Sequence, residues 1–225
     1  MQVFLETERL LLRQFTEDDL ENLVDLDSDP DVMRFLTGGP PTPRAVLQND
    51  YLPAYLRYYE RHEGFGFWAA IEKATGEFLG WFHFRPPEGG PADEPELGYR
   101  LRKAAWGKGY GTEGSRALIR KGFTELGVRR VVASTYQDNI GSRRVMEKAG
   151  MTLVRSFRPT PADFASHFPY DDAPQKVWDG DEVEYALEKA EWERQGAAAR
   201  EQLPGNENPA EREASRAPGR AIPPD

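Results

Sequence analysis

Three glycines alternate with other residues in the stretch Trp106-Gly107-Lys108-Gly109-Tyr110-Gly111-Thr112, between a predicted strand, 96–101, and a predicted helix, 112–126. A glycine-rich turn between a strand and a helix lets backbone N–H groups converge on an anion, because no Cβ blocks the approach and the helix adds its positive end. Thr112 is suited to cap that helix, and Lys108 adds a positive charge. The spacing matches neither an ATP-type phosphate loop nor a dinucleotide-binding motif. Taken alone, the pattern predicts either an anion-binding turn or a flexible turn with spare glycines.

A second motif lies one strand further along the chain. Residues 130–136 are rich in β-branched side chains and predict a strand, and residues 139–148 predict a helix that Gly150 ends. A strand–helix–strand unit of this kind places its two strands parallel. Asn139 and Ser142 fall on one side of the first helical turn, at the sheet edge where open α/β units bind ligands. Asn139 is also a suitable cap for the helix.

The remaining periodicities predict an α+β domain. The predicted elements are a strand over 7–15, a helix capped by Thr16, a short helix opened by Pro30, a helical stretch over 44–61, a hairpin of 65–72 and 78–84, and strands over 151–157 and 183–187. From residue 195 the chain has almost no large apolar side chain, so it cannot bury enough surface to offset its ordering entropy. We therefore predict one folded domain, 1–194, followed by a disordered C-terminal tail, 195–225.

Composition and charge argue against several classes of function. The sequence has no cysteine, and His62, His83 and His167 lack the spacing of metal ligands, so we expect no metal site. The formal net charge of -9 argues against a nucleic-acid-binding surface, and no apolar run is long enough to cross a bilayer. Residues 1–8 lack the basic and apolar segments of a secretory signal, which predicts a cytoplasmic protein without a membrane partner. The sequence is compatible with a monomer or a homodimer.

Three stretches resemble, in order, the motifs of one enzyme family. Residues 6–13 are similar to an opening strand written T-x-R-L-x-L-R, and residues 106–113 to a coenzyme loop written W-G-x-G-Y-A/G-T-E. Residues 139–151 resemble an N-x-x-S…E-K-x-G-F element, with Met151 in place of the usual aromatic residue. On these motifs the chain resembles the Gcn5-related N-acetyltransferases (GNAT), in particular the branch of the ribosomal-protein alanine N-acetyltransferases. The resemblance runs from about Leu5 to Trp192.

The resemblance implies a GNAT-like mixed, mostly antiparallel sheet with helices on both faces. Its one central parallel pair, 96–101 and 130–136, would splay to admit coenzyme A, whose pantetheine arm would pair with backbone near 99–102. The pyrophosphate would bind the amides of 108–112. The residues that the resemblance assigns to the coenzyme are Tyr99, Leu101, Arg102, Trp106, Gly107, Lys108, Gly109, Tyr110, Gly111, Thr112, Asn139, Ser142 and Arg143. Candidates for its 3′-phosphate are Arg102, Lys103, Arg143 and Lys148.

The implied reaction is transfer of an acetyl group from acetyl-coenzyme A to a primary amine, on a protein N-terminus or a small molecule. Such a transfer needs a base for the ammonium and a proton for the departing thiolate. The resemblance gives the first role to Glu96, with Asp93 and Glu94 as rivals. Ser142 either donates to the sulfur or only orients the coenzyme, and Tyr136 is a second candidate acid.

The sequence leaves two further points open. A regulatory module that binds coenzyme A without catalysis, or another phosphate-binding protein, would use the same glycine loop. The acceptor pocket is expected between the helical stretch 44–61 and the irregular segment 158–180. Its candidate wall and ammonium-attracting residues are Phe164, His167, Phe168, Tyr170, Asp171, Asp172 and Trp178.

Overall fold

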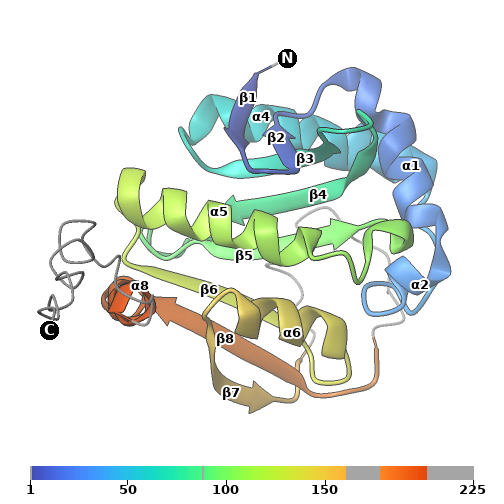
Figure 1. Cartoon of the computed structure of the whole chain (residues 1–225). Helices are drawn as coiled ribbons and strands as arrows, with labels where there is room; N and C mark the ends of the chain where they lie inside the picture. The colour runs from blue at the N-terminus through green and yellow to red at the C-terminus, as the bar shows by residue number, and fades with distance from the viewer. Residues whose placement is uncertain (1, 88, 161–177, 202–225) are drawn as a thin grey trace, which may run out of the picture.

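One sheet of eight strands, in the order β1-β2-β3-β4-β5-β6-β8-β7, runs through the structure (Figure 1). The structure is a computed structural model that describes residues 2–87, 89–160 and 178–201. The strands are β1 (Val3–Glu6), β2 (Leu10–Arg13), β3 (Gly66–Glu72), β4 (Phe78–Arg85), β5 (Glu96–Leu101), β6 (Arg130–Tyr136), β7 (Thr152–Phe157) and β8 (Glu182–Glu188). Among them only β5 and β6 pair in parallel, and they lie inside the sheet. The predicted mixed, mostly antiparallel sheet is therefore confirmed.

The predicted strand over 7–15 contains β2 but is too long at both ends, and β1, which precedes it, was not predicted. The chain reverses direction between β1 and β2. The Thr7 N–H donates to the Leu10 carbonyl at 2.9 Å, and the Thr7 hydroxyl accepts from the Leu10 N–H at 2.8 Å. A side chain that takes up backbone hydrogen bonds in this way favours a turn over a continuous strand. The two short strands pair with each other as an antiparallel hairpin, and β2 then pairs with β3.

Helices cover both faces of the sheet. They are α1 (Leu20–Ser28), α2 (Pro30–Met33), α3 (Arg44–Val46), α4 (Leu52–Arg61), α5 (Tyr110–Glu125), α6 (Ile140–Lys148) and α8 (Lys189–Glu201), with single turns at Glu17–Asp19 and Lys103–Ala105 and a π-helical segment, Leu47–Tyr51, joining α3 to α4. Alternate side chains of β4 point to opposite faces. Phe82 and Phe84 join the core under α5, whereas Trp81 joins a second core under α1 and α4. None of the described helices is long and apolar enough to cross a membrane.

Two glycines let α5 lie directly on the sheet. A Cβ at Gly114 would come within 2.3 Å of the Phe82 ring, and one at Gly122 within 2.7 Å of the Phe84 ring. The aromatic rings of β4 therefore fill the space that side chains would take on this face of the helix. This close packing fixes the position of the N-terminal turn of α5 relative to the end of β5.

The last helix crosses the predicted domain boundary. The predicted tail begins at residue 195, yet α8 continues to Glu201. The Gln195 side-chain amide donates to the Gly150 carbonyl at 3.1 Å, which ties this turn of α8 to the end of α6. Residues 202–225, which make up most of the predicted tail, lie outside the described residues.

A buried ion pair joins β5 to α1. Arg100 and Asp27 lie 2.5 Å apart, and both side chains are almost fully buried. The Arg100 guanidinium also lies over the Trp81 ring, and the Thr42 hydroxyl donates to the other Asp27 oxygen at 2.6 Å. Removing one partner of such a pair leaves the other charge buried without compensation. The pair therefore holds α1 against the strand that carries the candidate base.

We expect Asp27→Ala to lower the free energy of unfolding by about 3–5 kcal/mol, because the Arg100 charge would stay buried without its partner. Asp25→Ala is a matched control on the same helix, since Asp25 forms an exposed pair with Arg102 at 3.3 Å. An exposed pair contributes at most about 1 kcal/mol. Urea unfolding followed by circular dichroism measures both changes, and equal losses would contradict this account.

Candidate active site

The two parallel strands separate almost as soon as they meet. β5 and β6 share one register position, Glu96 opposite Val132, and the Val132 N–H donates to the Pro95 carbonyl at 3.1 Å. Beyond it the two strands have no further paired position among the described residues. Backbone groups of alternate residues point to opposite sides of a strand, so the amides of Tyr99 and Leu101 face the opening rather than β4. An extended ligand can pair with this free edge as an added strand does.

The glycine loop lies at the wide end of this opening. Gly107 and Gly109 have φ values of 72° and 87°, a region that strongly favours glycine. Gly109 is the N-cap of α5, and no side chain caps the first turn. Thr112 was expected to be the cap, but α5 begins at Tyr110, so Thr112 lies within the first turn. The first-turn amides and the positive end of α5 are therefore arranged to receive an anion.

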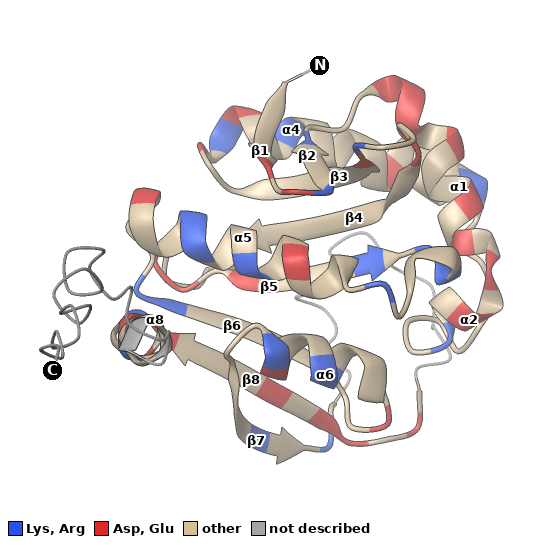
Figure 2. Ribbon diagram, viewed as in Figure 1, with Lys and Arg blue, Asp and Glu red and all other residues tan. Residues whose placement is uncertain are grey.

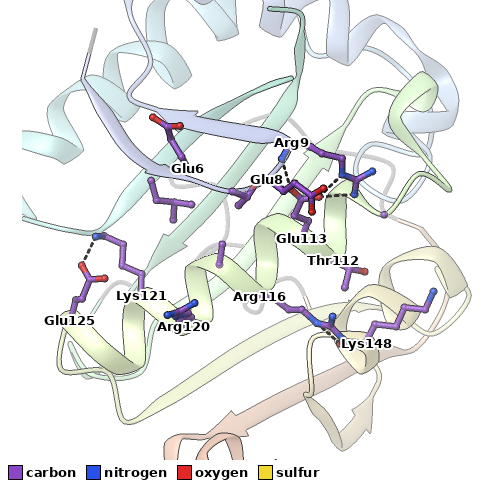
Figure 3. Close-up of a pocket in the computed structure, with 14 residues that line it drawn as sticks. Glu6, Glu8, Arg9, Thr112, Glu113, Arg116, Arg120, Lys121, Glu125 and Lys148 are labelled. Carbon is purple, nitrogen blue, oxygen red and sulfur yellow. Dashed lines mark hydrogen bonds and ion pairs between the residues drawn. The ribbon is translucent and has the colours of Figure 1, made fainter. Parts of the chain in front are cut away.

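A network of hydrogen bonds fastens this loop to the start of the chain (Figure 3). The Arg9 Nε donates to Glu113 Oε2 at 2.7 Å, and the Arg9 N–H and the Thr7 hydroxyl donate to Glu113 Oε1 at 2.9 and 2.5 Å. Burial would raise the pKa of the Glu113 carboxyl, but hydrogen bonds from Thr7 and Arg9 outweigh it and hold that pKa below its ordinary value. Arg9 also donates to the Lys108 carbonyl at 2.9 Å. The motifs at residues 6–13 and 106–113 are therefore in direct contact. Their separate positions in the sequence did not indicate this contact.

Trp106 links the loop to the end of β5. Its indole N–H donates to the Leu101 carbonyl at 2.8 Å, while its ring stays exposed. Both residues were predicted to contact the coenzyme, and the structure brings them into contact with each other. The Leu101 carbonyl therefore already has a donor.

Tyr99 and Ser142 meet across the opening. The Tyr99 hydroxyl lies 2.9 Å from the Ser142 hydroxyl and donates to the Ser142 carbonyl at 3.0 Å. Asn139 caps α6, since its side-chain oxygen accepts from the Ser142 N–H at 3.2 Å. Burial raises the pKa of the Tyr99 hydroxyl well above its ordinary value, although the Ser142 hydrogen bond partly opposes the shift. Because Tyr99 belongs to β5 and Ser142 to α6, the pair puts two hydroxyl groups between the separating strands.

The first two candidates for the 3′-phosphate form ion pairs with the acidic α1–α2 segment. Arg102 lies 3.3 Å from Asp25, and Lys103 lies 2.6 Å from Asp31. Both contacts tie the segment after β5 to the helices on the face opposite α5.

The other two candidates lie on α6. The Arg143 Nε donates to the Tyr185 hydroxyl at 3.1 Å, so this side chain is held against β8. Lys148 lines a groove of about 790 Å³ that runs along α5 from Thr112 and includes Arg116 (Figure 3). The structure therefore separates the four candidates, and Lys148 is the one that shares a groove with the glycine loop.

Glu96 and its two rivals have different surroundings. Asp93 and Glu94 both form ion pairs with Arg129, and the Asp93 carboxylate lies 3.3 Å from the Arg129 guanidinium. Glu96 instead lies 3.7 Å from the His83 Nε2, with both side chains largely buried. His83 was not predicted as a site residue. The only signal in the sequence was its place two residues after Trp81, which puts both side chains on the same face of the strand.

Tyr136 lies on the α2 side of β6. Its side chain is buried, and this burial is the main cause that raises the pKa of its hydroxyl to about 12. Its ring stacks on Phe35 with 6.4 Å between centroids, and Phe35 in turn contacts Trp178 at 4.8 Å. Trp178 is the only predicted wall residue that the structure describes. The others, Phe164, His167, Phe168, Tyr170, Asp171 and Asp172, lie outside the described residues.

A separating parallel pair with a glycine turn at the head of the next helix defines the class of acyl-coenzyme A-dependent transferases. Comparison with known proteins supports this class. A family model described as an acetyltransferase (GNAT) domain matches residues 9–152. FsC-acetyl coenzyme A-N(2)-transacetylase of Aspergillus fumigatus is 33% identical over 198 residues, covering 84% of this chain and 78% of the fungal protein. The uncharacterized Bacillus subtilis protein YkkB is 32% identical over 158 residues, 68% of this chain and 88% of its own.

Solved structures share the fold. A GNAT-family acetyltransferase from Bacillus anthracis superposes with a TM-score of 0.64 at 25% identity, covering 84% of this chain and 99% of its own. RimL, a ribosomal L7/L12 alpha-N-protein acetyltransferase in complex with coenzyme A, superposes with a TM-score of 0.65 at 17% identity, covering 83% of this chain and 98% of its own. The chain belongs to the GNAT family of acetyltransferases. It is an acyl-coenzyme A-dependent N-acetyltransferase, with acetyl-coenzyme A as donor and an amine as acceptor.

We expect Gly109→Ala to weaken coenzyme A binding about tenfold, the equivalent of roughly 1.4 kcal/mol, because a Cβ at positive φ strains the turn that presents the first amides of α5. Gly127→Ala is a matched control at the other end of α5, with φ of 70° and no atom within 4 Å of its Cβ. Both variants should lose similar folding stability, but only Gly109→Ala should lose affinity in isothermal titration. Equal affinities would contradict the assignment of the loop.

Proposed function

We propose that this N-acetyltransferase transfers the acetyl group to the nitrogen of a primary amine at the N(2) position of a small molecule. The support comes from the name of the Aspergillus fumigatus relative, which specifies an N(2)-transacetylase, and from the share of both chains that the similarity covers. The observation that carries the proposal is the single pairing position, Glu96 opposite Val132, after which the strands part. It leaves backbone groups of β5 available to an acyl donor, with the Glu96 carboxylate at the closed end.

The two faces of β5 divide the chemistry between them. Glu96 and Arg100 are on one face, toward α1, where Arg100 binds Asp27. Tyr99 points to the other face, where its hydroxyl meets Ser142. An amine that approaches from the α1 side therefore meets a proton acceptor, and the thiolate departs toward two hydroxyl groups that can supply a proton. The amide of Tyr99 or Leu101 stabilises the negative charge that develops on the thioester oxygen.

Charge on the acceptor side favours a cation. Figure 2 shows Asp and Glu concentrated on α1 and α2. Between residues 17 and 33 the chain carries acidic side chains and no lysine or arginine. They are Glu17, Asp18, Asp19, Glu21, Asp25, Asp27, Asp29 and Asp31. Asp19, Glu21, Asp25, Asp27 and Asp31 form ion pairs with Arg13, Arg44, Arg102, Arg100 and Lys103, which weakens this negative field. The remaining acidic side chains favour the approach of an ammonium substrate.

We expect Glu96→Gln to lower kcat about 100-fold, since removal of the ammonium proton contributes that order of magnitude and Glu96 takes part in it directly or through a neighbour, with little change in coenzyme A affinity. Glu94→Gln is the matched control, because Glu94 lies two residues away but pairs with Arg129. Thiol release under saturating substrates measures both rates. An unchanged rate in Glu96→Gln would remove this carboxylate from the reaction.

An amine panel tests the acceptor. It compares amino-acid amides with a free N(2) amine and a blocked side chain, lysine derivatives with only the side-chain amine free, and a peptide with a free N-terminus. We expect the highest kcat/KM for the small N(2) amines, by at least about tenfold, or roughly 1.4 kcal/mol of discrimination. A preference for the peptide would instead favour a protein substrate, and activity on the side-chain amine alone would refute the N(2) assignment.

A further inference from the structure

An imidazole lies on the acceptor face of β5, beside the candidate base. His83 belongs to β4 and stands directly opposite Gly98 of β5 in the sheet register. Its ring packs against two aromatic rings, Trp81 with 5.9 Å between centroids and Phe67 with 5.6 Å in an edge-on arrangement. Its Nε2 lies 3.7 Å from Glu96 Oε2. The ring therefore packs against two aromatic side chains, and its Nε2 lies near the carboxylate.

The residue opposite His83 must be glycine for the ring to take this position. A Cβ at Gly98 would lie 2.5 Å from both Cε1 and Nε2 of the imidazole, closer than real Cβ contacts come. Gly98 is not among the glycines with positive φ, so its backbone does not require glycine. The requirement comes from the imidazole, which lies over the bare backbone of β5.

This position is nearer the opening than that of Glu96. Glu96 is paired with Val132 at the closed end, whereas Gly98 lies two residues further along, where β5 and β6 have separated. The next residue, Tyr99, carries the first amide that faces the opening. The imidazole therefore lies next to the strand segment at which the acyl group is expected, and on the face from which the amine is expected.

We propose that His83 is the catalytic residue that takes the proton from the acceptor ammonium, and that Glu96 is a positioning residue that orients the imidazole and stabilises the imidazolium. This proposal rests on the proposed function, because it concerns the base of that same reaction. The ordinary pKa of imidazole, about 6.5, is closer to that of an alkyl ammonium than the ordinary pKa of a carboxyl, about 4.3, so imidazole is the better proton acceptor near neutral pH.

The proton and electron balance is complete with these groups. One N–H bond of the ammonium breaks and its proton moves to His83, which later releases it to water. The freed nitrogen lone pair forms the C–N bond with the thioester carbon, and the C–S bond breaks with its electron pair on sulfur. The nitrogen then loses a second proton, and the sulfur gains one. The hydroxyl pair of Tyr99 and Ser142 relays this proton to the sulfur.

Several charged or titratable groups face this imidazole and bear on its pH dependence. From β4 and β5 these are Arg85, Glu96 and Arg100, the last paired with Asp27 of α1. From α4 come Tyr55 and Tyr58, whose rings pack against Phe67 beside the imidazole and whose pKa values burial raises.

A double-mutant cycle tests the contact between the ring and the strand. We expect His83→Gln to lower kcat about 100-fold and Gly98→Ala, which displaces the ring, to lower it to a similar extent. The double variant should fall no more than about threefold below His83→Gln, because two changes that remove one interaction are not additive. His62→Gln, a change of an exposed histidine at the end of α4, is the matched control and should keep the wild-type rate. Coenzyme A affinity, measured by isothermal titration, should stay within about twofold throughout, or roughly 0.4 kcal/mol.

A second readout separates catalysis from a structural role. An alkyl amine must lose a proton before it attacks, whereas an aromatic amine is already neutral at pH 7. The rate loss in His83→Gln should therefore shrink at least about tenfold with the aromatic amine. Equal losses with both amines, additive effects in the cycle, or a wild-type rate in His83→Gln would each overturn the assignment of His83. If the wild-type protein binds coenzyme A but releases no thiol with any amine, the proposed function itself fails.

Discussion

The separation of β5 from β6 is the constraint on which the rest of the site depends. Parallel neighbours normally continue to pair along their length, and here they pair at one position, Glu96 opposite Val132. The backbone groups beyond it would remain without strand partners, which is costly unless a ligand or water satisfies them. In the proposed site, an acyl donor between the strands would supply those partners. The fold therefore keeps a binding edge inside its sheet, where an ordinary sheet would have none.

The two walls of this opening are held by different interactions. On the acceptor side, the Arg100–Asp27 pair joins β5 to α1 with both charges buried. On the donor side, Tyr99 reaches α6 through Ser142, and Glu113 joins the glycine loop to the first hairpin. These contacts leave β5 in the middle. In the proposed mechanism, one face of this strand takes up the proton of the amine and the other supplies the proton of the thiolate, so the incoming amine stays apart from the departing thiolate.

The sequence was informative where local chemistry decides structure. Gly107 and Gly109 form the predicted turn between a strand and a helix, with positive φ, and Asn139 caps α6 as its residue type favours. Local patterns failed where a side chain competes with the backbone or where packing extends an element. Thr7 forms a turn, so β2 begins only at Leu10, and contacts with the end of α6 carry α8 past residue 195. The coenzyme contacts assigned by resemblance and the disordered tail stay predictions.

By itself, the sequence determined the class of this protein: an α+β domain with a parallel pair, a glycine loop and the motifs of the GNAT family. Those features depend on residues close together in the chain, so their spacing is visible without a structure. Only the tertiary structure decided which side chains meet. Thr7 and Arg9 bind Glu113 more than a hundred positions away, and Arg100 finds Asp27 across the sheet. The imidazole of His83 lies over Gly98 because strand register, rather than any spacing in the sequence, puts a bare backbone beneath it.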